Sequence, residues 1–173
     1  MKNVKTEERC EFCNGPLASR MSTMERPYRF DLSGLDNVFL VGVEVEECQK
    51  CGRQTAVTIP KMEGLHKAIA KELLAKKDLL IGKEIRFLRK HAGIAANRFA
   101  ELLRIDPSYL SRVENGKMDN LGAGLDKLAR AIYAEVMSSR DAASRLLMDK
   151  DQKAEPAPAT FGIKRNHWEK LAA

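Results

Sequence analysis

The sequence predicts an α+β protein with a small β-rich metal-binding domain at the N-terminus, a linker helix and an all-α domain. All four cysteines lie in the first 51 residues, as two C-x2-C pairs. β-branched residues cluster between and after these pairs, whereas apolar residues after Lys61 recur every three or four positions, the period of an amphipathic helix. A chain of 173 residues has room for two small domains.

The four cysteines predict one structural zinc ion, and the ligands are Cys10, Cys13, Cys48 and Cys51. A two-residue spacer lets both thiolates of a tight turn reach one ion, and two such turns supply the tetrahedral sulfur shell that zinc prefers. A catalytic zinc would keep an open position and usually include His or Glu, and disulfides are disfavoured in a reducing compartment. Gly15 and Gly52 follow the pairs, where we expect turns with φ > 0.

The segment around the second cysteine pair predicts strands. Residues 38–45 are rich in β-branched and aromatic side chains, and alternation places Val41, Val43 and Val45 on one face. A second strand covers 54–59, and an edge strand lies around 22–30. Because a 60-residue domain buries little apolar surface, we expect the zinc to supply much of its folding free energy.

From residue 61 the pattern predicts helices. A linker helix covers 62–77, and further helices cover 82–91, 95–103, 107–114 and 124–137. Asp106 and Pro107 are typical of an N-cap and a first helical position. The helices at 95–103 and 107–114, joined by a short turn, predict a helix-turn-helix whose second helix enters a major groove. In the last helix we expect Leu125, Leu128 and Ile132 to face inward.

Charge is unevenly distributed along the chain. The net charge is +6 overall, with −1 in residues 1–60, +6 in 61–150 and +1 in 151–173. The positive excess of the middle segment suggests a polyanionic partner, and a solvated helical surface is the alternative. No apolar run approaches the ~18 residues of a membrane span, and no signal peptide is visible, so we expect a cytoplasmic protein without membrane contact.

These patterns predict four segments. They are a zinc-binding domain at 1–60, a linker helix at 61–78, a helix-turn-helix domain at 79–148 and a flexible tail at 149–173. The tail begins with a polar, Pro/Ala-rich stretch and ends with Phe161 and Trp168, which either dock on a surface or have no strong role.

Two stretches resemble known families. Residues 93–117, with Phe-Ala-Glu-Leu-Leu and Tyr-Leu-Ser-Arg-Val-Glu-Asn-Gly-Lys, resemble the lambda-repressor/Cro (XRE) class of helix-turn-helix domains. Residues 34–51, with Gly-Leu-Asp-Asn-Val-Phe-Leu-Val-Gly-Val-Glu-Val-Glu-Glu-Cys-Gln-Lys-Cys, and the later Ile59-Pro60 resemble the YgiT-type zinc finger. Together, over about residues 8–137, they are similar to the MqsA family of antitoxins and autorepressors.

The resemblance implies a homodimeric repressor that binds a palindromic operator in double-stranded DNA and is nucleoid-associated when bound. It also implies that the N-terminal domain binds a small toxin protein. By position, the residues facing bases are Ser108, Tyr109 and Arg112, and those suited to phosphates are Asn97, Arg98, Asn115 and Lys117. Arg89 and Glu114 match a structural ion pair of the class.

The chain departs from this class at two positions. Ala96 stands where a phosphate-anchoring Gln is common, which shifts the expected contacts toward Arg98. Arg104 stands in the inter-helix turn where Gly is usual and φ > 0 is required.

Three alternative functions differ from the antitoxin hypothesis. They are a stand-alone regulator without a toxin, a protein-interaction module without DNA binding, and a zinc enzyme. We expect no catalytic residues, because His66, His91 and His167 lack the ligand spacing of an enzyme site.

Overall fold

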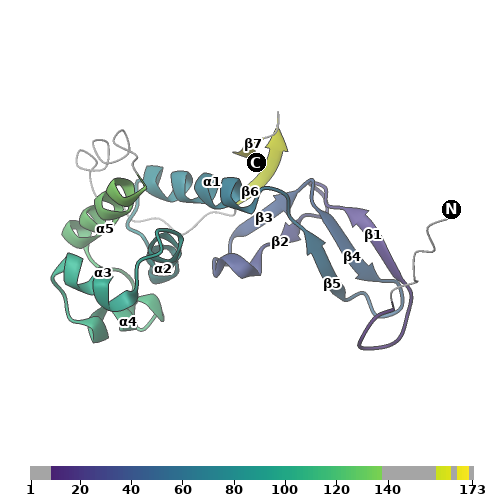
Figure 1. Ribbon diagram of the computed structural model, residues 1–173, viewed down its shortest axis with the longest axis horizontal. Coiled ribbons are helices and arrows are strands. Elements are labelled where there is room, and N and C mark those ends of the chain that lie inside the picture. Colours follow the sequence, from purple (N-terminus) through teal and green to yellow (C-terminus); the bar gives the residue numbers. More distant parts are fainter. Residues whose placement is uncertain (1–8, 138–158, 165–166, 172–173) are drawn as a thin grey trace. The chain divides into compact units, whose positions relative to one another are not determined.

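The computed structural model describes residues 9–137, 159–164 and 167–171, which form two compact units (Figure 1). The first unit contains the described residues up to Phe30, then Asn37–Leu65 and the C-terminal strands. The second contains Asp31–Asp36 and the residues from His66 onward. The predicted α+β fold is confirmed, with β-sheets and the four cysteines in the first unit and helices in the second.

The first unit has two sheets. In the first sheet, β4 (Glu44–Cys48) pairs antiparallel with β1 (Leu17–Met21) on one side and β5 (Gln54–Thr58) on the other. In the second sheet the order is β2 (Tyr28–Arg29), β3 (Val38–Val41), β6 (Ala159–Lys164) and β7 (His167–Lys170). A short 3₁₀ helix, η1 (Asp31–Ser33), lies between β2 and β3 in the chain and belongs to the second unit.

The strand predicted over 38–45 is divided between the two sheets. Gly42 has φ +78°, a left-handed conformation that glycine adopts without strain, and it separates β3 from β4. Buried Ser22 holds this break, because its Oγ accepts from the Val43 N–H at 3.0 Å. Alternation restarts after the break, so Val38 and Leu40 are buried in one sheet and Val43 and Val45 in the other, while Val41 is half-buried.

The C-terminal residues differ from the predicted flexible tail at 149–173. Residues 159–164 and 167–170 form β6 and β7, and β6 pairs parallel with β3, Phe161 lying opposite Leu40. Phe161 is buried, and the Trp168 Nε1–H donates to the Pro60 carbonyl at 3.1 Å. The two aromatic side chains therefore complete the first unit, whereas the polar stretch before residue 159 lies outside the described residues.

Five helices make up most of the described part of the second unit. They are α1 (Met62–Ala75), whose first turn belongs to the first unit, α2 (Gly82–His91), α3 (Ala96–Leu103), α4 (Pro107–Glu114) and α5 (Ala123–Val136). The core includes Phe99, Leu103, Leu110 and Val113, all nearly fully buried. Gly82 allows α2 to pack closely on α4, because a Cβ there would lie 1.8 Å from the Val113 carbonyl oxygen. Within the part of the chain that is described, no helix is both long and apolar enough to span a bilayer.

The buried face of α5 is not the one the sequence predicted. Asp126, Ala129, Arg130 and Tyr133 are buried, whereas Leu125 and Ile132 are half-buried and Leu128 is exposed. The physical reason is that polar side chains of α5 form hydrogen bonds with backbone groups at and after the end of α1. Asp126 accepts from the Leu80 N–H at 2.8 Å, and the Arg130 guanidinium donates to four carbonyls, those of Leu73, Leu74, Lys76 and Asp78.

Candidate metal centre and candidate nucleic-acid interface

The four predicted metal ligands come together in the first unit. The Cys10 and Cys51 sulfurs are 3.8 Å apart, those of Cys13 and Cys48 are 3.4 Å apart, and all four lie within 4.8 Å of one another. Sulfurs about 2.3 Å from a tetrahedral zinc ion are separated by about 3.8 Å. The cluster therefore fits one metal ion such as zinc without rearrangement of the backbone.

Two similar turns position these thiols. In the first, the Asn14 N–H donates to the Cys10 carbonyl at 2.8 Å, and in the second the Gly52 N–H donates to the Cys48 carbonyl at 2.8 Å. Within these two turns, the residues with positive φ are Asn14 (54°) and Gly52 (68°). Gly15 therefore does not have the φ > 0 that the sequence suggested. Gly15 is needed for space instead, since a Cβ there would lie 2.7 Å from the Lys50 Cβ and 3.0 Å from the Cys48 Sγ.

The turns also create unequal thiol acidities. The backbone N–H groups of Cys51 and Lys50 stabilise a thiolate and lower the pKa of Cys48 to about 6. The Gly15 N–H acts in the same direction on Cys13, but the sulfurs of the other three cysteines and burial together outweigh it and raise the pKa of Cys13 to about 12. Because metals bind the thiolate form, the backbone N–H groups of these turns favour the charge state that metal binding requires.

In the second unit, the turn between α3 and α4 begins with a C-cap residue in the left-handed conformation. Arg104 has φ 55° and ψ 42°, the left-handed conformation predicted for this position, and its N–H donates to the Ala100 and Glu101 carbonyls. A non-glycine residue in this conformation costs on the order of 1 kcal/mol. Ala100, which is fully buried, lets α3 pack closely in the core.

The start of α4 is fixed by a side-chain cap. An oxygen of Asp106 accepts from the Ser108 N–H at 2.7 Å, and Pro107 occupies the first helical position. Hydrogen bonds from the Ser108 hydroxyl and N–H hold the pKa of Asp106 below its ordinary value. Leu110 and Val113 point into the core, so the opposite face of α4 presents Ser108 and Arg112 to solvent, with Tyr109 half-buried.

The residues predicted to contact phosphates lie at exposed positions on both sides of α4. Asn97 and Arg98 are in the first turn of α3, and Asn115 and Lys117 are in the turn after α4. Arg98 pairs with Glu101 on its own helix at 2.9 Å, and the Asn115 Nδ2 donates to the Ser111 carbonyl at 2.8 Å. Their contacts with DNA stay predictions.

Arg89 and Glu114 lie together in a two-pronged buried ion pair. The Arg89 Nε donates to one Glu114 carboxylate oxygen at 2.7 Å, and its Nη2 donates to the other at 2.8 Å. The Arg89 Nη1 also donates to the Ile94 carbonyl at 2.9 Å. This pair joins α2 to the last residue of α4, a position from which it can hold the orientation of α4.

Sequence reasoning missed a set of buried charges around the end of α1. Glu84 is buried and accepts from the Lys76 Nζ and from the Ile81 N–H, both at 2.9 Å. Asp126 and Arg130, four residues apart on α5, lie 2.8 Å from each other. Burial raises the pKa of Asp126, although the Leu80 N–H and Arg130 act in the opposite direction. Charged residues in an amphipathic helix usually face solvent, so little in the sequence indicated that these charges are buried. The i,i+4 spacing of Asp126 and Arg130 was the one signal that could have suggested an ion pair.

Comparison with known proteins is consistent with this geometry in the second unit. A family model described as helix-turn-helix matches residues 85–131, from α2 to α5, with the α3–α4 pair at its centre. No curated protein and no solved structure matches the chain. The chain therefore contains a helix-turn-helix domain at 85–131, of the class with which transcriptional regulators bind DNA.

Proposed function

We propose that this protein is a homodimeric, sequence-specific DNA-binding repressor whose N-terminal unit is stabilised by one structural Zn²⁺. The observation that carries the proposal is the matched helix-turn-helix domain with the outer face of α4 open to solvent. In domains of this class the second helix of the motif lies in the major groove, and its N-terminal residues meet base edges.

Arg112 is the proposed base reader. Its guanidinium lies at the exposed face of α4, where its Nη2 donates to the Met118 sulfur at 3.4 Å. A thioether is a weak acceptor, so exchanging this bond for a two-pronged contact with guanine O6 and N7 costs little free energy. Ser108 and Tyr109 complete the proposed reading face, while Asn97, Arg98, Asn115 and Lys117 supply phosphate contacts.

A gel shift on the DNA upstream of the gene, with zinc-loaded protein, tests this proposal. Arg112→Ala should abolish the specific shift. Arg112→Lys keeps the charge and loses the planar fork, so it should retain non-specific binding while specific affinity falls at least tenfold. Log affinity should fall with log salt concentration with a slope of several units, as in proteins that neutralise several phosphates. If wild-type protein gives no shift at moderate salt, or the slope is near zero, the DNA-binding proposal is wrong.

The exposed apolar face of α5 supports a homodimer. Leu128, Ile132 and Val136 recur every four residues on one side of the helix, and Leu128 and Val136 are exposed. We propose that this stripe is paired with its copy in a second chain, because two-fold symmetric pairing is the commonest form of association and matches a palindromic operator.

A second proposal concerns the first unit, where several large apolar side chains face solvent. Phe12, Met21 and Met24 are all exposed, and the Arg53 guanidinium lies 4.2 Å from the centre of the Phe12 ring. Exposed apolar side chains of this size favour a protein partner, and the antitoxin resemblance suggests a small basic toxin. Coexpression with the product of the adjacent gene tests this idea. Copurification that is lost in Met21→Glu but kept in Thr55→Glu, an exposed polar position on β5, would support it.

A further inference from the structure

Three cations form a row on the exposed face of α2. Lys83, Arg86 and Lys90 are three and four residues apart, so the helical period places them on one side of the helix. Like charges at this spacing repel one another and destabilise an isolated helix. An anion bound along the row would relieve that repulsion.

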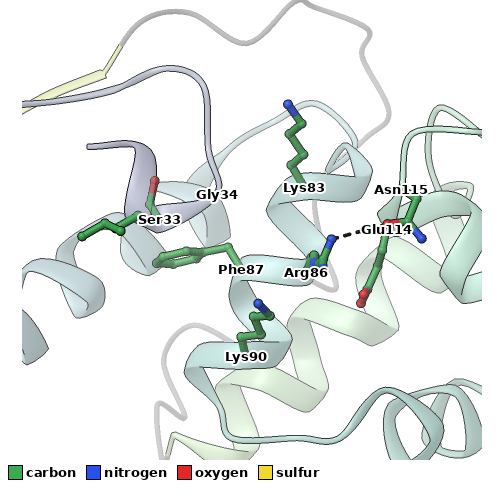
Figure 2. A pocket seen from close by; sticks show the side chains of 9 residues that line it. Ser33, Gly34, Lys83, Arg86, Phe87, Lys90, Glu114 and Asn115 are labelled. Atoms are coloured by element: carbon green, nitrogen blue, oxygen red, sulfur yellow. Dashed lines mark hydrogen bonds between the residues drawn. The ribbon is translucent and has the colours of Figure 1, made fainter. Parts of the chain in front are cut away.

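Two cavities adjoin the row, and Figure 2 shows residues that line the first of them. The first, of about 340 Å³, is lined by the three cations, by the 32–34 segment and by Asn115 at its far side. The second, of about 350 Å³, shares Phe87 and Lys90 with the first and adds His66 and His91. Each volume falls in the range of small-molecule sites, roughly 300–1,000 Å³.

The first cavity contains cationic groups that could bind an anion. Glu114 is the one carboxylate among its described lining residues, and Arg89 already holds both of its oxygens. Asp36 pairs with Lys83. In Figure 2, Arg86 reaches toward Asn115, whose Oδ1 accepts from it at 3.4 Å, a long hydrogen bond that a stronger acceptor would replace.

The second cavity is aromatic. The His66 ring lies edge-on to Phe87, with ring centres 5.8 Å apart, and 5.5 Å from His91. The Tyr133 hydroxyl is hydrogen-bonded to the His91 Nδ1 at 2.8 Å. Burial lowers the pKa of His66, so its ring is uncharged at neutral pH and suits an apolar or aromatic group rather than a second anion.

We infer that these adjoining cavities form a binding site for a phosphate monoester with an aromatic organic group. Arg86 and Lys90 would hold the phosphate, and the organic group would lie against Phe87 toward the histidines. A phosphate monoester carries about −1.5 to −2 charges at neutral pH, which two cations balance, and a guanidinium matches its oxygens in pairs. The same phosphate chemistry is also present in the DNA backbone, so the test must separate these two sources.

Calorimetric titration of the full-length, zinc-loaded protein with phenyl phosphate and with inorganic phosphate tests the inference without DNA. Phenyl phosphate should bind one site per chain and more tightly than inorganic phosphate. The variant Arg86→Gln/Lys90→Gln should lose at least tenfold in affinity. Lys71→Gln/Lys77→Gln removes two exposed cations outside the cavities and should bind like wild type. Matching thermal denaturation curves would show that both variants are folded.

The same two variants in the gel shift identify the source of the phosphate. If phenyl phosphate does not bind, but Arg86→Gln/Lys90→Gln alone lowers the salt slope for DNA by about two units, the site binds backbone phosphates and the free-ester assignment falls. If neither measurement separates the two variants, the site does not exist. Because the titration needs no DNA, a protein that binds phenyl phosphate but no operator would refute the repressor proposal and leave this one standing.

Discussion

At the scale of single residues, the contribution of an Arg–Glu ion pair to stability depends on whether the pair is buried or exposed. The side chains of Arg89 and Glu114 are 10% and 7% exposed, whereas those of Arg98 and Glu101 are 64% and 63% exposed. Removing one partner of a buried pair leaves an uncompensated charge in a medium of low dielectric constant. Removing one partner of an exposed pair leaves a charge that water stabilises.

We therefore expect Glu114→Ala to destabilise the helix-turn-helix domain by about 3–5 kcal/mol. Glu101→Ala should change the free energy of unfolding by less than about 1 kcal/mol, since it breaks an exposed pair. Denaturant unfolding followed by circular dichroism at 222 nm measures both values. An unchanged midpoint for Glu114→Ala would show that the buried pair has no structural role.

Gly15 is a second residue whose importance depends on its neighbours. An added methyl group would press on the Lys50 Cβ and on the Cys48 Sγ, so Gly15→Ala should move a ligand and weaken metal affinity at least tenfold. Gly124→Ala is a matched control, because the space around that glycine is open. Competition with a chromophoric zinc chelator measures both affinities. Equal zinc affinity in the two variants would refute a positioning role for Gly15.

At the scale of elements, the helices were predicted well because their signals are local. Asp106 and Pro107 begin α4 as predicted, and α2 has its predicted bounds. The strands depend on partners distant in the chain. Nothing near Phe161 indicates that β6 pairs with β3, more than a hundred residues earlier, and the break at Gly42 depends on a contact with Ser22. The cysteine cluster was predictable because metal-ligand spacing is itself a local pattern.

The orientation of α5 was mispredicted for a related reason, and the apolar stripe it leaves exposed makes a testable prediction. Leu128→Glu should convert a dimer into a monomer, because it places a charge in the proposed apolar interface. Leu102→Glu is the matched control, since Leu102 on α3 is 37% exposed and Leu128 is 39% exposed. Sedimentation velocity gives the oligomeric state. A wild-type monomer at micromolar concentration, or a dimeric Leu128→Glu protein, would exclude this interface.

At the scale of the whole molecule, the two units depend on different sources of stability. The second unit has an apolar core that includes Phe99, Leu110 and Val113. The first unit is small, and its two cysteine turns meet at a cluster of four sulfurs. Binding of a structural zinc ion contributes apparent free energies of about 10–16 kcal/mol in small zinc domains, comparable with the whole stability of a typical domain, about 5–15 kcal/mol. Metal removal should therefore unfold one unit and spare the other.

The single tryptophan makes this difference measurable. Trp168 is buried in the first unit, where its indole N–H donates to the Pro60 carbonyl, so its fluorescence reports on that unit, while ellipticity at 222 nm reports mainly on the helices. A strong zinc chelator should shift Trp168 emission to longer wavelength and leave most helical ellipticity unchanged. Cys48→Ser should have the same effect without chelator. Simultaneous loss of both signals would mean that the helices need the metal as well, and an unchanged emission spectrum would mean that the first unit folds without it.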